Sequence, residues 1–444
     1  MGLPTAAALI AFGHQVRCAE SDPVRLRRLK SGELPILEDG LLDALRNARQ
    51  RHRLEFIDSA AEAARGADFV FLCVQTPQQP DGSADLSYLE QAALDIRPTL
   101  RAGCIVVNKS TVPIGSTTFV EGLLSRQDVH VVSNPEFLRE GTALSDSLHP
   151  DRIVVGASDL DAAALVGALF RRTGAPLVIT DPLTAETVKY VANAFLATKV
   201  SFMNTVANLC EAVNADIRDV ILGLGYDRRI GFDFLRPGPG WGGSCLPKDT
   251  EALLSMAAQA DFDFTLLRTV IAINRCQVTR MVDKLENAIR SHFQVDSSSP
   301  VLEGRRIAVW GLTFKADTDD LRESPALRIV SLLIAKGAQV SAFEPSLLFS
   351  GNGSDFAARI RTAWGQLGAE PEALERLTIA PTAIAACRNA CGLMLLTEWE
   401  EFRQIDFPSL AQALSAPILI DARNLLDPQA ARAAGFHYCG VGRK

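Results

Sequence analysis

Hydrophobic and polar positions in the first third of the chain follow two alternating patterns. Short β-branched runs that end in polar or small residues are typical of buried strands; these are DFVFLCV (68–74), CIVVNKS (104–110), VHVVSN (129–134) and RIVVGA (152–157). Segments with helical periodicity, such as DLSYLEQAALDI, lie between them. This alternation predicts a parallel sheet that is covered by helices on both faces.

The pattern becomes helical from about Thr184 onward. TAETVKYVANAFLATKVSFMNTVANLCEAVNA has apolar residues at helical spacing, and no strand-like run appears before RRIAVWGL (305–312). The polar stretch VDSSSPVLEGRR, which precedes that run, reads as a linker. The middle of the chain is therefore predicted to be a separate helical block.

Strand and helix alternate again after the linker, through IAVWGL, a helix from Ser324, AQVSAFEP, GLMLLT and APILID. We interpret GNGSDFAARI (351–360) as a loop insertion. The expected fold class is α/β, with two Rossmann-like doubly wound domains joined by a central helical domain. The expected boundaries are 1–182, 183–295 and 296–444.

Composition narrows the class of protein. The chain has 444 residues, 48% of them hydrophobic and 22% charged, which is ordinary for a globular protein. A net charge of −7 provides no basic surface for nucleic acid. No apolar run reaches the roughly 18 residues that span a membrane, and no basic signal region begins the chain. Nine cysteines without paired spacing suggest reduced thiols in a cytoplasm, with no metal site expected at Cys387 and Cys391.

The start of the chain carries half of a dinucleotide-binding pattern. A helix, PTAAALIAFG, is followed by a short strand, HQVRCAE, that ends in Glu20. An acidic residue about 20 positions after a G-x-G-x-x-G loop binds the adenosine ribose. Gly2 fits the third glycine, but the first strand and the other two glycines are absent. One alternative is that the loop never existed here. Because Glu20 is in register, we expect instead that the chain is truncated or that its start was assigned downstream of the real one.

Later strand ends also carry polar residues that are typical of a binding site. These are Thr76 with Pro77, Ser110 with Thr111, and Glu136 with Glu140. If residues 136–140 are helical, the two carboxylates share one face. The alternative for each is a helix cap or a polar loop, but all three lie at strand ends of one predicted sheet, where such folds bind ligands.

The stretch GPGWGGSCLPKD (238–249) places a thiol after a glycine-rich turn. Lys248 and Asp249 follow Cys245 closely. A nearby cation favours the thiolate, and a carboxylate can transfer protons, so this pattern indicates a nucleophilic cysteine. The alternative, an inert core thiol, needs none of these neighbours.

Seven motifs in order resemble the UDP-glucose/GDP-mannose dehydrogenase family. They are VQTP, KSTVPIGST, NPEFLREGTALSD with PDRIVVG, AETVKYVANAFLATKVSFMN, GWGGSCLPKD, GLTFKADTDDLRESPAL and IDARN. The resemblance covers essentially the whole chain. It implies oxidation of a sugar C6 alcohol to a carboxylate in two hydride transfers to NAD, through a cysteine thiohemiacetal and a thioester.

The resemblance implies roles for residues that match the family motifs. The catalytic set is Cys245, Lys189, Asn193, Asp249, Glu136 and Thr111. In it, Cys245 is the nucleophile, and Lys189 stabilises the oxyanion with Asn193 one helical turn on. Asp249 orients or activates the site. Glu136 is an acid or base, and Thr111 positions the hydrolytic water.

The resemblance also implies two sets of binding residues. The substrate set is Phe137, Leu138, Glu140, Lys189, Asn193, Arg229, Phe234, Trp241, Gly242, Lys315 and Arg423. The cofactor set is Glu20, Arg25, Thr76, Thr111, Glu140, Lys248 and Arg322. Lys315 and Arg423 would bind the nucleotide, and Arg229 would reach a neighbouring subunit, which implies at least a homodimer. The alternatives are a solvated helix cation for Lys189, a surface charge for Arg423 and plain packing for Trp241.

The motifs also bear on the substrate and the cofactor. GGSCLPKD resembles the glucose and mannose branches, because the N-acetylhexosamine branch has His where this chain has Ser244. RPGPGW resembles the UDP-glucose branch more than the GDP-mannose branch, which implies UDP-glucose as the substrate. Glu20 favours NAD over NADP, since a carboxylate repels a 2′-phosphate. Two alternatives stay open: oxidation of GDP-mannose or a UDP-N-acetylhexosamine, and a catalytically silent nucleotide-sugar-binding subunit.

Overall fold

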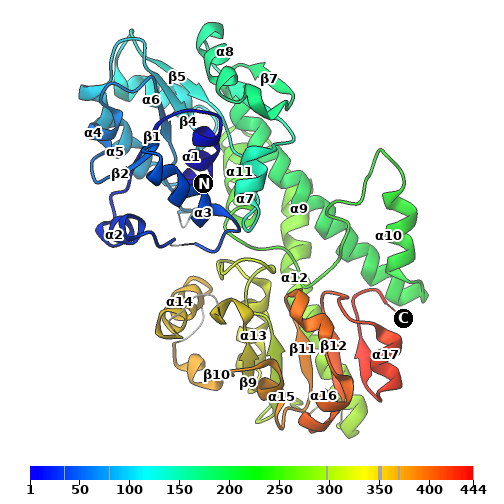
Figure 1. Cartoon of the computed structure of the whole chain (residues 1–444). Coiled ribbons are helices and arrows are strands. Elements are labelled where there is room, and N and C mark those ends of the chain that lie inside the picture. Colours follow the sequence, from blue (N-terminus) through cyan, green and yellow to red (C-terminus); the bar gives the residue numbers. More distant parts are fainter. Residues whose placement is uncertain (35, 80, 297–298, 349–352, 369–370, 444) are drawn as a thin grey trace. The chain divides into compact units, whose positions relative to one another are not determined.

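The computed structural model describes residues 1–34, 36–79, 81–296, 299–348, 353–368 and 371–443. The chain divides into two units (Figure 1). The first unit contains Met1–Ala192 and Glu251–Asp263, and the second contains Asn193–Thr250 and Phe264–Lys444.

The strands of the first unit form two separate sheets. β1 (Val16–Ala19) pairs in parallel with β2 (Leu54–Ile57). The second sheet has the order β3 (Phe69–Leu72), β4 (Ile105–Asn108), β5 (His130–Ser133), β6 (Ile153–Gly156) and β7 (Leu177–Thr180). The four predicted strands are confirmed, each with narrower bounds.

One pair of neighbouring strands departs from the predicted parallel arrangement. β5 and β6 are antiparallel and share one register position, Ser133 opposite Gly156, whereas the other neighbours are parallel. Only α7 (Ala143–Leu148), a short helix, lies between these two strands in the sequence. A parallel connection requires a crossover of a dozen or more residues, usually with a longer helix.

The helices of the first unit alternate with its strands, as predicted. They are α1 (Gly2–Ala11), α2 (Pro23–Ser31), α3 (Leu41–Gln50), α4 (Ala60–Ala64), α5 (Ser87–Ile96), α6 (Ser116–Leu124), α7 and α8 (Leu160–Leu169). Side chains of Asp22, Ser59 and Asp159 cap three of these helices by accepting backbone N–H groups of the first turn.

The middle of the chain is helical, which confirms the prediction. α9 (Pro182–Val213) has 32 residues and α12 (Thr265–Phe293) has 29. α10 (Ile217–Gly225) and α11 (Leu246–Gln259) lie between them. The loop that contains Cys245 leads directly into α11.

The second unit contains a six-stranded parallel sheet. Its order is β10 (Leu377–Ile379), β9 (Gln339–Phe343), β8 (Arg306–Trp310), β11 (Leu393–Leu395), β12 (Ile418–Asp421) and β13 (His437–Cys439). The remaining helices are α13 (Pro325–Ala335), α14 (Gly353–Gln366), α15 (Ala383–Cys387), α16 (Phe407–Ala413) and α17 (Pro428–Ala433). The two central strands, β8 and β11, are almost wholly buried, as expected of a sheet covered on both faces.

Two sequence interpretations in this unit need correction. GNGSDFAARI is not a loop insertion, because α14 begins at Gly353; Gly351 and Asn352 lie outside the described residues. Phe356, Ile360 and Trp364 on this helix are buried at helical spacing. Burial of this apolar face in the core stabilises the segment as a helix. In the linker, Ser297 and Ser298 lie outside the described residues, whereas Val301 and Leu302 belong to the core.

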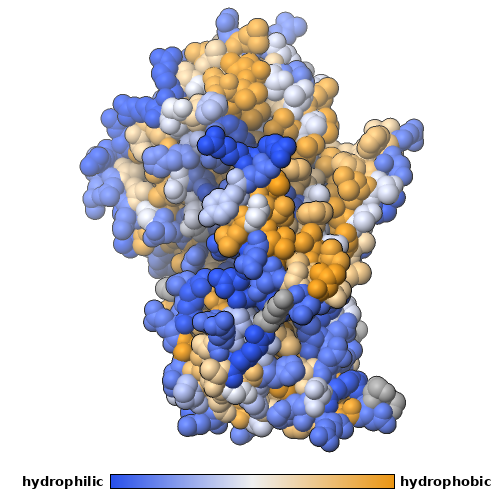
Figure 2. Space-filling model, turned by 90° about the vertical axis from the view of Figure 1, so that its right-hand side faces the viewer, coloured by the Kyte–Doolittle hydropathy of each residue, from blue (hydrophilic) through white to orange (hydrophobic). Residues whose placement is uncertain are grey.

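Figure 2 shows a face on which patches of hydrophobic side chains lie among hydrophilic ones. Within the part of the chain that the structure describes, no helix has the length and apolar character needed to cross a membrane.

Candidate active site

Three side-chain amides hold the backbone of the loop before Cys245. Asn204 Oδ1 on α9 accepts the Gly238 N–H at 2.8 Å, and Gln277 Nε2 on α12 donates to the Gly238 carbonyl at 2.9 Å. Asn274 on α12 binds both backbone groups of Trp241, at 2.8 and 2.9 Å. These hydrogen bonds fix the loop. They also avoid the free-energy penalty of burying backbone N–H and C=O groups without partners.

Close backbone contacts explain the glycines of this loop. A Cβ atom on Gly242 would lie 2.1 Å from the Glu323 carbonyl oxygen. Gly243 has a φ of +85° and donates its N–H to the Arg322 carbonyl at 3.1 Å. Only glycine fits the first position without a clash, and glycine tolerates the left-handed conformation of the second.

Cys245 lies immediately before the first residue of α11 and is half-buried. Its carbonyl accepts the Asp249 N–H at 3.0 Å, which begins the helix, and Ser244 Oγ lies 3.5 Å from its sulfur. A thiol at a helix N-terminus experiences the positive end of the helix dipole, which favours the thiolate. Cys245 is therefore only partly enclosed by the protein, at the start of a helix.

Asp249 contacts two other residues of the predicted site, Asn193 and Lys248. The side chain is 1% exposed; its Oδ2 accepts Asn193 Nδ2 at 2.5 Å, and its Oδ1 lies 2.5 Å from Lys248 Nζ. Charge-assisted hydrogen bonds of this kind are short and strong. The thiol and this carboxylate therefore occupy the same first turn of α11.

Lys189 and Glu136 form a buried ion pair in the first unit. Lys189 Nζ lies 3.2 Å from Glu136 Oε1, and the two side chains are 4% and 5% exposed. Burial alone would raise the pKa of Glu136, but the Lys189 ammonium and the Leu138 backbone N–H together lower it below its ordinary value. Glu136 is therefore a carboxylate, and Lys189 is not a solvated helix cation.

Sequence reasoning missed the buried Lys109, although its motif was recognised. Lys109 Nζ donates to Asn134 Oδ1 at 2.9 Å and lies 5.4 Å from the Phe170 ring centroid. Burial lowers the pKa of Lys109 to about 8, partly offset by the charge of Glu136. Both Lys109 and Asn134 directly follow buried strands, so the signal that identified Ser110 also applied to them.

The conditional prediction of a helix at residues 136–140 is wrong. This segment is irregular, and α7 begins only at Ala143. Glu136 Oε2 accepts the Leu138 N–H at 2.6 Å, a local side-chain bond that competes with helical pairing. Glu140 is half-buried, and the Phe137 ring lies 3.7 Å from the Arg152 guanidinium carbon.

Two residues of the predicted cofactor set, Glu20 and Arg25, border one large cavity of the first unit. Glu20 follows β1, and its Oε1 accepts the Asp22 N–H at 3.0 Å. Glu20, Arg25 and Gly2 line the cavity, so an acidic side chain and the start of α1 adjoin the same space. The acidic side chain suits the adenosine ribose of NAD. The positive end of α1 suits the phosphates of NAD.

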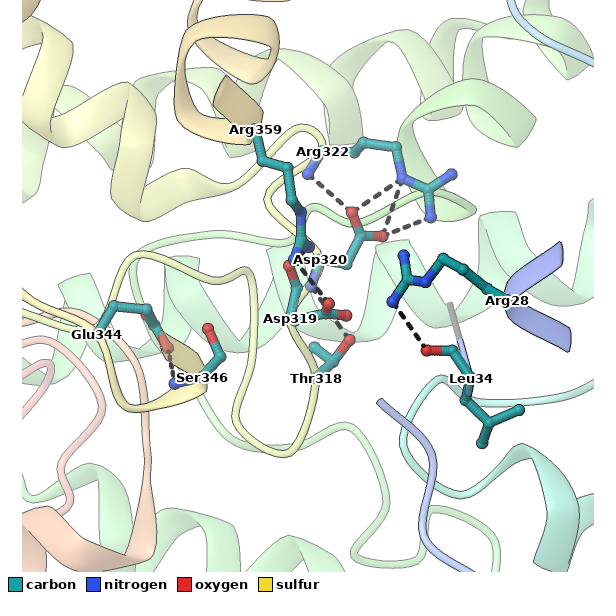
Figure 3. A network of polar contacts seen from close by, with 9 residues as sticks. All are labelled: Arg28, Leu34, Thr318, Asp319, Asp320, Arg322, Glu344, Ser346 and Arg359. Atoms are coloured by element: carbon teal, nitrogen blue, oxygen red, sulfur yellow. Dashed lines mark hydrogen bonds and ion pairs between the residues drawn. The ribbon is translucent and has the colours of Figure 1, made fainter. Parts of the chain in front are cut away.

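The other cofactor residues lie at two places. Thr76 and Thr111 are buried, and Thr76 Oγ1 donates to the Thr111 carbonyl at 2.8 Å, which links the loops after β3 and β4. Lys248 and Arg322 belong to the second unit. There, the Arg322 guanidinium makes a forked contact to Asp320, at 2.7 Å for its shortest bond (Figure 3).

The second unit brings together the predicted nucleotide residues and the glycine loop. Arg423 donates to the Leu396 and Phe314 carbonyls, at 2.8 Å each. Lys315 follows Phe314 directly, and a Cβ atom on Gly238 would lie 3.5 Å from the Arg423 guanidinium. Arg423 is therefore a largely buried cation beside the loop, not a surface charge.

Three further substrate candidates differ in exposure. Trp241 is 8% exposed, and its Nε1 donates to Ser201 Oγ on α9 at 2.9 Å. Phe234 is half-buried with a φ of +61°. The Arg229 side chain is 88% exposed and pairs with Asp227 at 2.6 Å.

Glu344 is a buried carboxylate that sequence reasoning did not select. It follows β9, as Glu20 follows β1, and accepts N–H groups from Leu312 at 2.5 Å and Ser346 at 3.0 Å (Figure 3). Burial raises its pKa, against the effect of these bonds. The acidic residue in AQVSAFEP was the available signal.

Family models match three successive parts of the chain. Models of the UDP-glucose/GDP-mannose dehydrogenase family match residues 1–173 as its NAD binding domain, 183–276 as its central domain and 308–428 as its UDP binding domain. The chain is similar to a UDP-glucose 6-dehydrogenase of Pseudomonas aeruginosa, with 42% identity over 454 residues that cover 100% of this chain and 95% of the relative.

Two solved structures are also similar to this chain. One is a UDP-glucose dehydrogenase from Pyrobaculum islandicum, with a TM-score of 0.85, 33% identity and coverage of 100% of this chain and 95% of the other. The second is a UDP-D-ManNAc dehydrogenase from Pyrococcus horikoshii, with a TM-score of 0.83, 26% identity and coverage of 100% and 97%. Because the family models span most of the chain and the identity extends over its whole length, the chain belongs to the UDP-glucose/GDP-mannose dehydrogenase family.

Proposed function

We propose that this chain oxidises UDP-glucose to UDP-glucuronate with NAD, and that Cys245 is the nucleophile. The observation that carries the proposal is the position of the thiol at the start of α11, four residues before the buried Asp249 that binds Asn193. NAD, when bound, accepts a hydride in each of two oxidations.

The need for a nucleophile follows from the substrate chemistry. A primary alcohol loses one hydride and one proton to become an aldehyde, which has no hydroxyl from which a second oxidation can proceed. The Cys245 sulfur adds to the aldehyde carbon and gives a thiohemiacetal. Loss of the second hydride leaves a thioester, and water then releases the carboxylate and regenerates the thiol. The sum is one alcohol, one water and two NAD converted to one carboxylate, two NADH and three protons.

Asp249 and Asn193 support the proton movements at the thiol. Asp249 is buried and held on both oxygens, by Asn193 and by Lys248, so its orientation is fixed. We infer that the carboxylate sets the position of Asn193, whose amide then contacts the reacting oxygen. Thr111 would position the hydrolytic water.

Lys189 provides the positive charge for the developing oxyanion. It lies four residues before Asn193 on α9, so the two side chains share one face of the helix. A preorganised ammonium at such a position stabilises negative charge that appears only in the transition state. Glu136, ionised beside it, can accept a proton as a base.

The choice of sugar rests on the relatives and on the glycine loop. Identity is 42% to a UDP-glucose 6-dehydrogenase but 26% to the UDP-D-ManNAc dehydrogenase. Lys315 and Arg423 supply cations for the pyrophosphate and the ribosyl-uracil. Oxidation of GDP-mannose or a UDP-N-acetylhexosamine and a silent binding subunit are not favoured. Residues 1–182, 183–295 and 296–444 would be the cofactor, central and UDP-binding domains.

We also propose a homodimer that forms along α9. Phe195, Phe202, Leu209 and Val213 on this helix are 63%, 59%, 59% and 62% exposed, and the first three are spaced by seven residues. An exposed apolar stripe of this kind marks an interaction surface. Light scattering on the Phe202→Glu variant tests it: a monomer is expected, and an unchanged mass would exclude this surface.

A cytoplasmic location is proposed from the thiols. All nine cysteines are free, five of them at least partly exposed. Such residues persist as thiols in a reducing compartment.

A panel of nucleotide sugars tests the proposed substrate. NADH is measured with UDP-glucose, GDP-mannose and a UDP-N-acetylhexosamine, each supplied as the limiting reactant with excess NAD. We expect two NADH per UDP-glucose and much slower reaction with the others. A higher kcat/KM for another sugar would replace UDP-glucose in the proposal.

A further inference from the structure

Four residues that follow β13, here the GVGR segment (residues 440–443), fit closely against the helices of the second unit. Val441 is fully buried and belongs to the same hydrophobic cluster as Ala207 on α9 and Leu285 on α12. Gly442 has a φ of +68°, and a Cβ atom there would lie 2.8 Å from the Ala207 Cα, a backbone atom. This position therefore requires glycine, both for its left-handed conformation and for its contact with α9.

Three helices bind the backbone of the GVGR segment. On α9, Glu211 Oε1 accepts the Gly442 N–H at 2.7 Å, and the Ile217 N–H at the start of α10 donates to the Gly442 carbonyl at 2.8 Å. On α12, Lys284 Nζ donates to the Gly440 carbonyl at 3.1 Å and to Glu211 Oε1 at 2.6 Å. Burial raises the pKa of Glu211, but the hydrogen bonds from Lys284 and Gly442 outweigh this effect and lower the pKa below its ordinary value. Glu211 is therefore a carboxylate that binds the segment.

The same segment also binds the loop that carries Arg423. This loop, here the Arg423 loop (residues 422–427), connects β12 to α17. Asn424 binds both backbone groups of Val441, since its Nδ2 donates to the carbonyl at 2.8 Å and its Oδ1 accepts the N–H at 2.8 Å. Arg443 Nη1 donates to the Leu426 carbonyl at 3.3 Å. Asn424 has a φ of +52°, a conformation that is uncommon outside glycine and that these contacts stabilise.

The backbone is fixed on both sides of Arg423. Its N–H donates to Asp421 Oδ1 at 3.1 Å, and Asp421 Oδ2 accepts the Leu426 N–H at 2.8 Å. Asn424, which directly follows Arg423, is held by Val441. Because the backbone conformation restricts the rotamers of a side chain, the contacts with the GVGR segment help to decide where the Arg423 guanidinium lies.

We propose that the GVGR segment is a positioning element for Arg423, which connects α9, α10 and α12 to the Arg423 loop and so maintains the affinity of the second unit for UDP. The inference rests on the proposed function, in which Arg423 supplies a cation to the nucleotide. A displaced segment should weaken UDP binding although no group of the nucleotide site is removed. It should also raise the KM for UDP-glucose and leave kcat nearly unchanged, as expected when only binding energy is lost.

Two alanine variants form a matched pair that tests this role. Gly442→Ala places a Cβ atom against the Ala207 backbone and displaces the segment. Gly435→Ala is the control, because Gly435 also has a positive φ, +89°, but nothing lies within 4 Å of an added Cβ atom. Both variants incur the strain of alanine at a positive φ, and only the first moves the segment. The Kd for UDP is measured by calorimetry in the parent and in both variants.

We expect the Kd for UDP to rise roughly tenfold in Gly442→Ala, the effect of one lost hydrogen bond to a charged group, and to stay within about twofold of the parent in Gly435→Ala. Asn424→Gly, which removes the bonds to Val441 and keeps the left-handed backbone available, should weaken UDP binding as well. This second variant adds no atom to the core, so it tests the proposal even if Gly442→Ala does not fold. Parent affinity in either Gly442→Ala or Asn424→Gly would overturn the proposal.

A double variant shows whether the segment acts through Arg423. In the Arg423→Met background, Gly442→Ala should cause no further loss of UDP affinity, because the side chain that it displaces is already absent. If the two losses multiply instead, the segment affects the nucleotide site by another route, and its role as a positioning element for Arg423 is overturned.

Amide hydrogen exchange separates this inference from the proposed function. The Arg423 and Leu426 amides should exchange roughly tenfold faster in Gly442→Ala than in Gly435→Ala, with β8 amides unchanged as the internal reference. Equal exchange in these two variants would overturn the positioning role. If exchange is faster but Arg423→Met binds UDP as tightly as the parent, the segment does hold the loop, and the nucleotide role proposed for Arg423 is the part that fails.

Discussion

Lys189 Nζ lies 3.2 Å from Glu136 Oε1, with both side chains almost completely removed from solvent. A buried ion pair is not in itself a source of stability, because desolvation of both charges opposes their attraction. Two charged groups held at this cost, on α9 and after β5, are more readily explained by the proposed chemistry than by folding.

Removing one member of this pair should destabilise the first unit. Glu136→Gln removes the carboxylate that faces the buried Lys189 ammonium, and we expect a loss of about 3–5 kcal/mol in unfolding free energy. The double variant Glu136→Gln/Lys189→Met should lose less than the sum of the single variants. Because the pKa of Glu136 is lowered, the contribution of its carboxylate is present above pH 4.5 and lost as pH falls through the folded pKa. The unfolding free energies are measured by denaturant titration. If the losses in the two single variants add up to the loss in the double variant, the pairing is contradicted.

Lys109 should produce a stability change at alkaline pH. Its pKa falls from 10.5 to about 8 on folding, so between these values the unfolded chain binds more protons than the folded one. Stability contributed by this group therefore rises with pH across that window, by about 1.4 kcal/mol per pKa unit. In Lys109→Met, this part of the rise should vanish. If the unfolding free energy of Lys109→Met rises with pH as steeply as that of the parent, a group other than Lys109 titrates in this range.

Asp249→Asn should impair catalysis more than folding. The substitution keeps the shape but removes the charge that holds Asn193 and Lys248. We expect kcat to fall by roughly 10²–10⁴-fold, the range of a lost acid–base group. Thermal unfolding of the variant and its affinity for UDP serve as controls. An unchanged kcat would exclude the carboxylate from the reaction.

Gly242→Ala should distort the loop that holds the thiol. The new Cβ would overlap the Glu323 carbonyl, a backbone atom that cannot rotate away. A loss of about 1–3 kcal/mol and slower alkylation of Cys245 are expected. Gly223→Ala is the matched control, since α10 leaves open space there and helical alanine is favoured by about 0.5–1 kcal/mol. Equal stability of the two variants would contradict the close contact.

The sequence was informative wherever a local pattern determines the structure. Short β-branched runs predicted the strands around 69–156 and the return of strands after residue 305, and helical spacing predicted the long helix α9. Local composition failed at GNGSDFAARI, where glycines suggested a loop but Phe356, Ile360 and Trp364 bury a helical face. It also failed at Glu136, whose own side chain replaces the expected helical bond.

Contacts between distant residues could not be predicted in this way. The amides that hold the glycine loop come from Asn204, Asn274 and Gln277, which lie 34, 33 and 39 residues from their partners. Nothing in the local pattern around those residues selects them. Likewise, the pairing of Lys189 with Glu136 depends on the tertiary fold, although each residue was selected separately.

The most direct test of the central claim compares the parent chain with Cys245→Ser at saturating UDP-glucose and NAD. The account predicts two NADH per sugar for the parent and a collapse of sustained turnover in the variant, with UDP binding retained. If the variant forms UDP-glucuronate with two NADH per sugar at the parent rate, Cys245 is not the nucleophile.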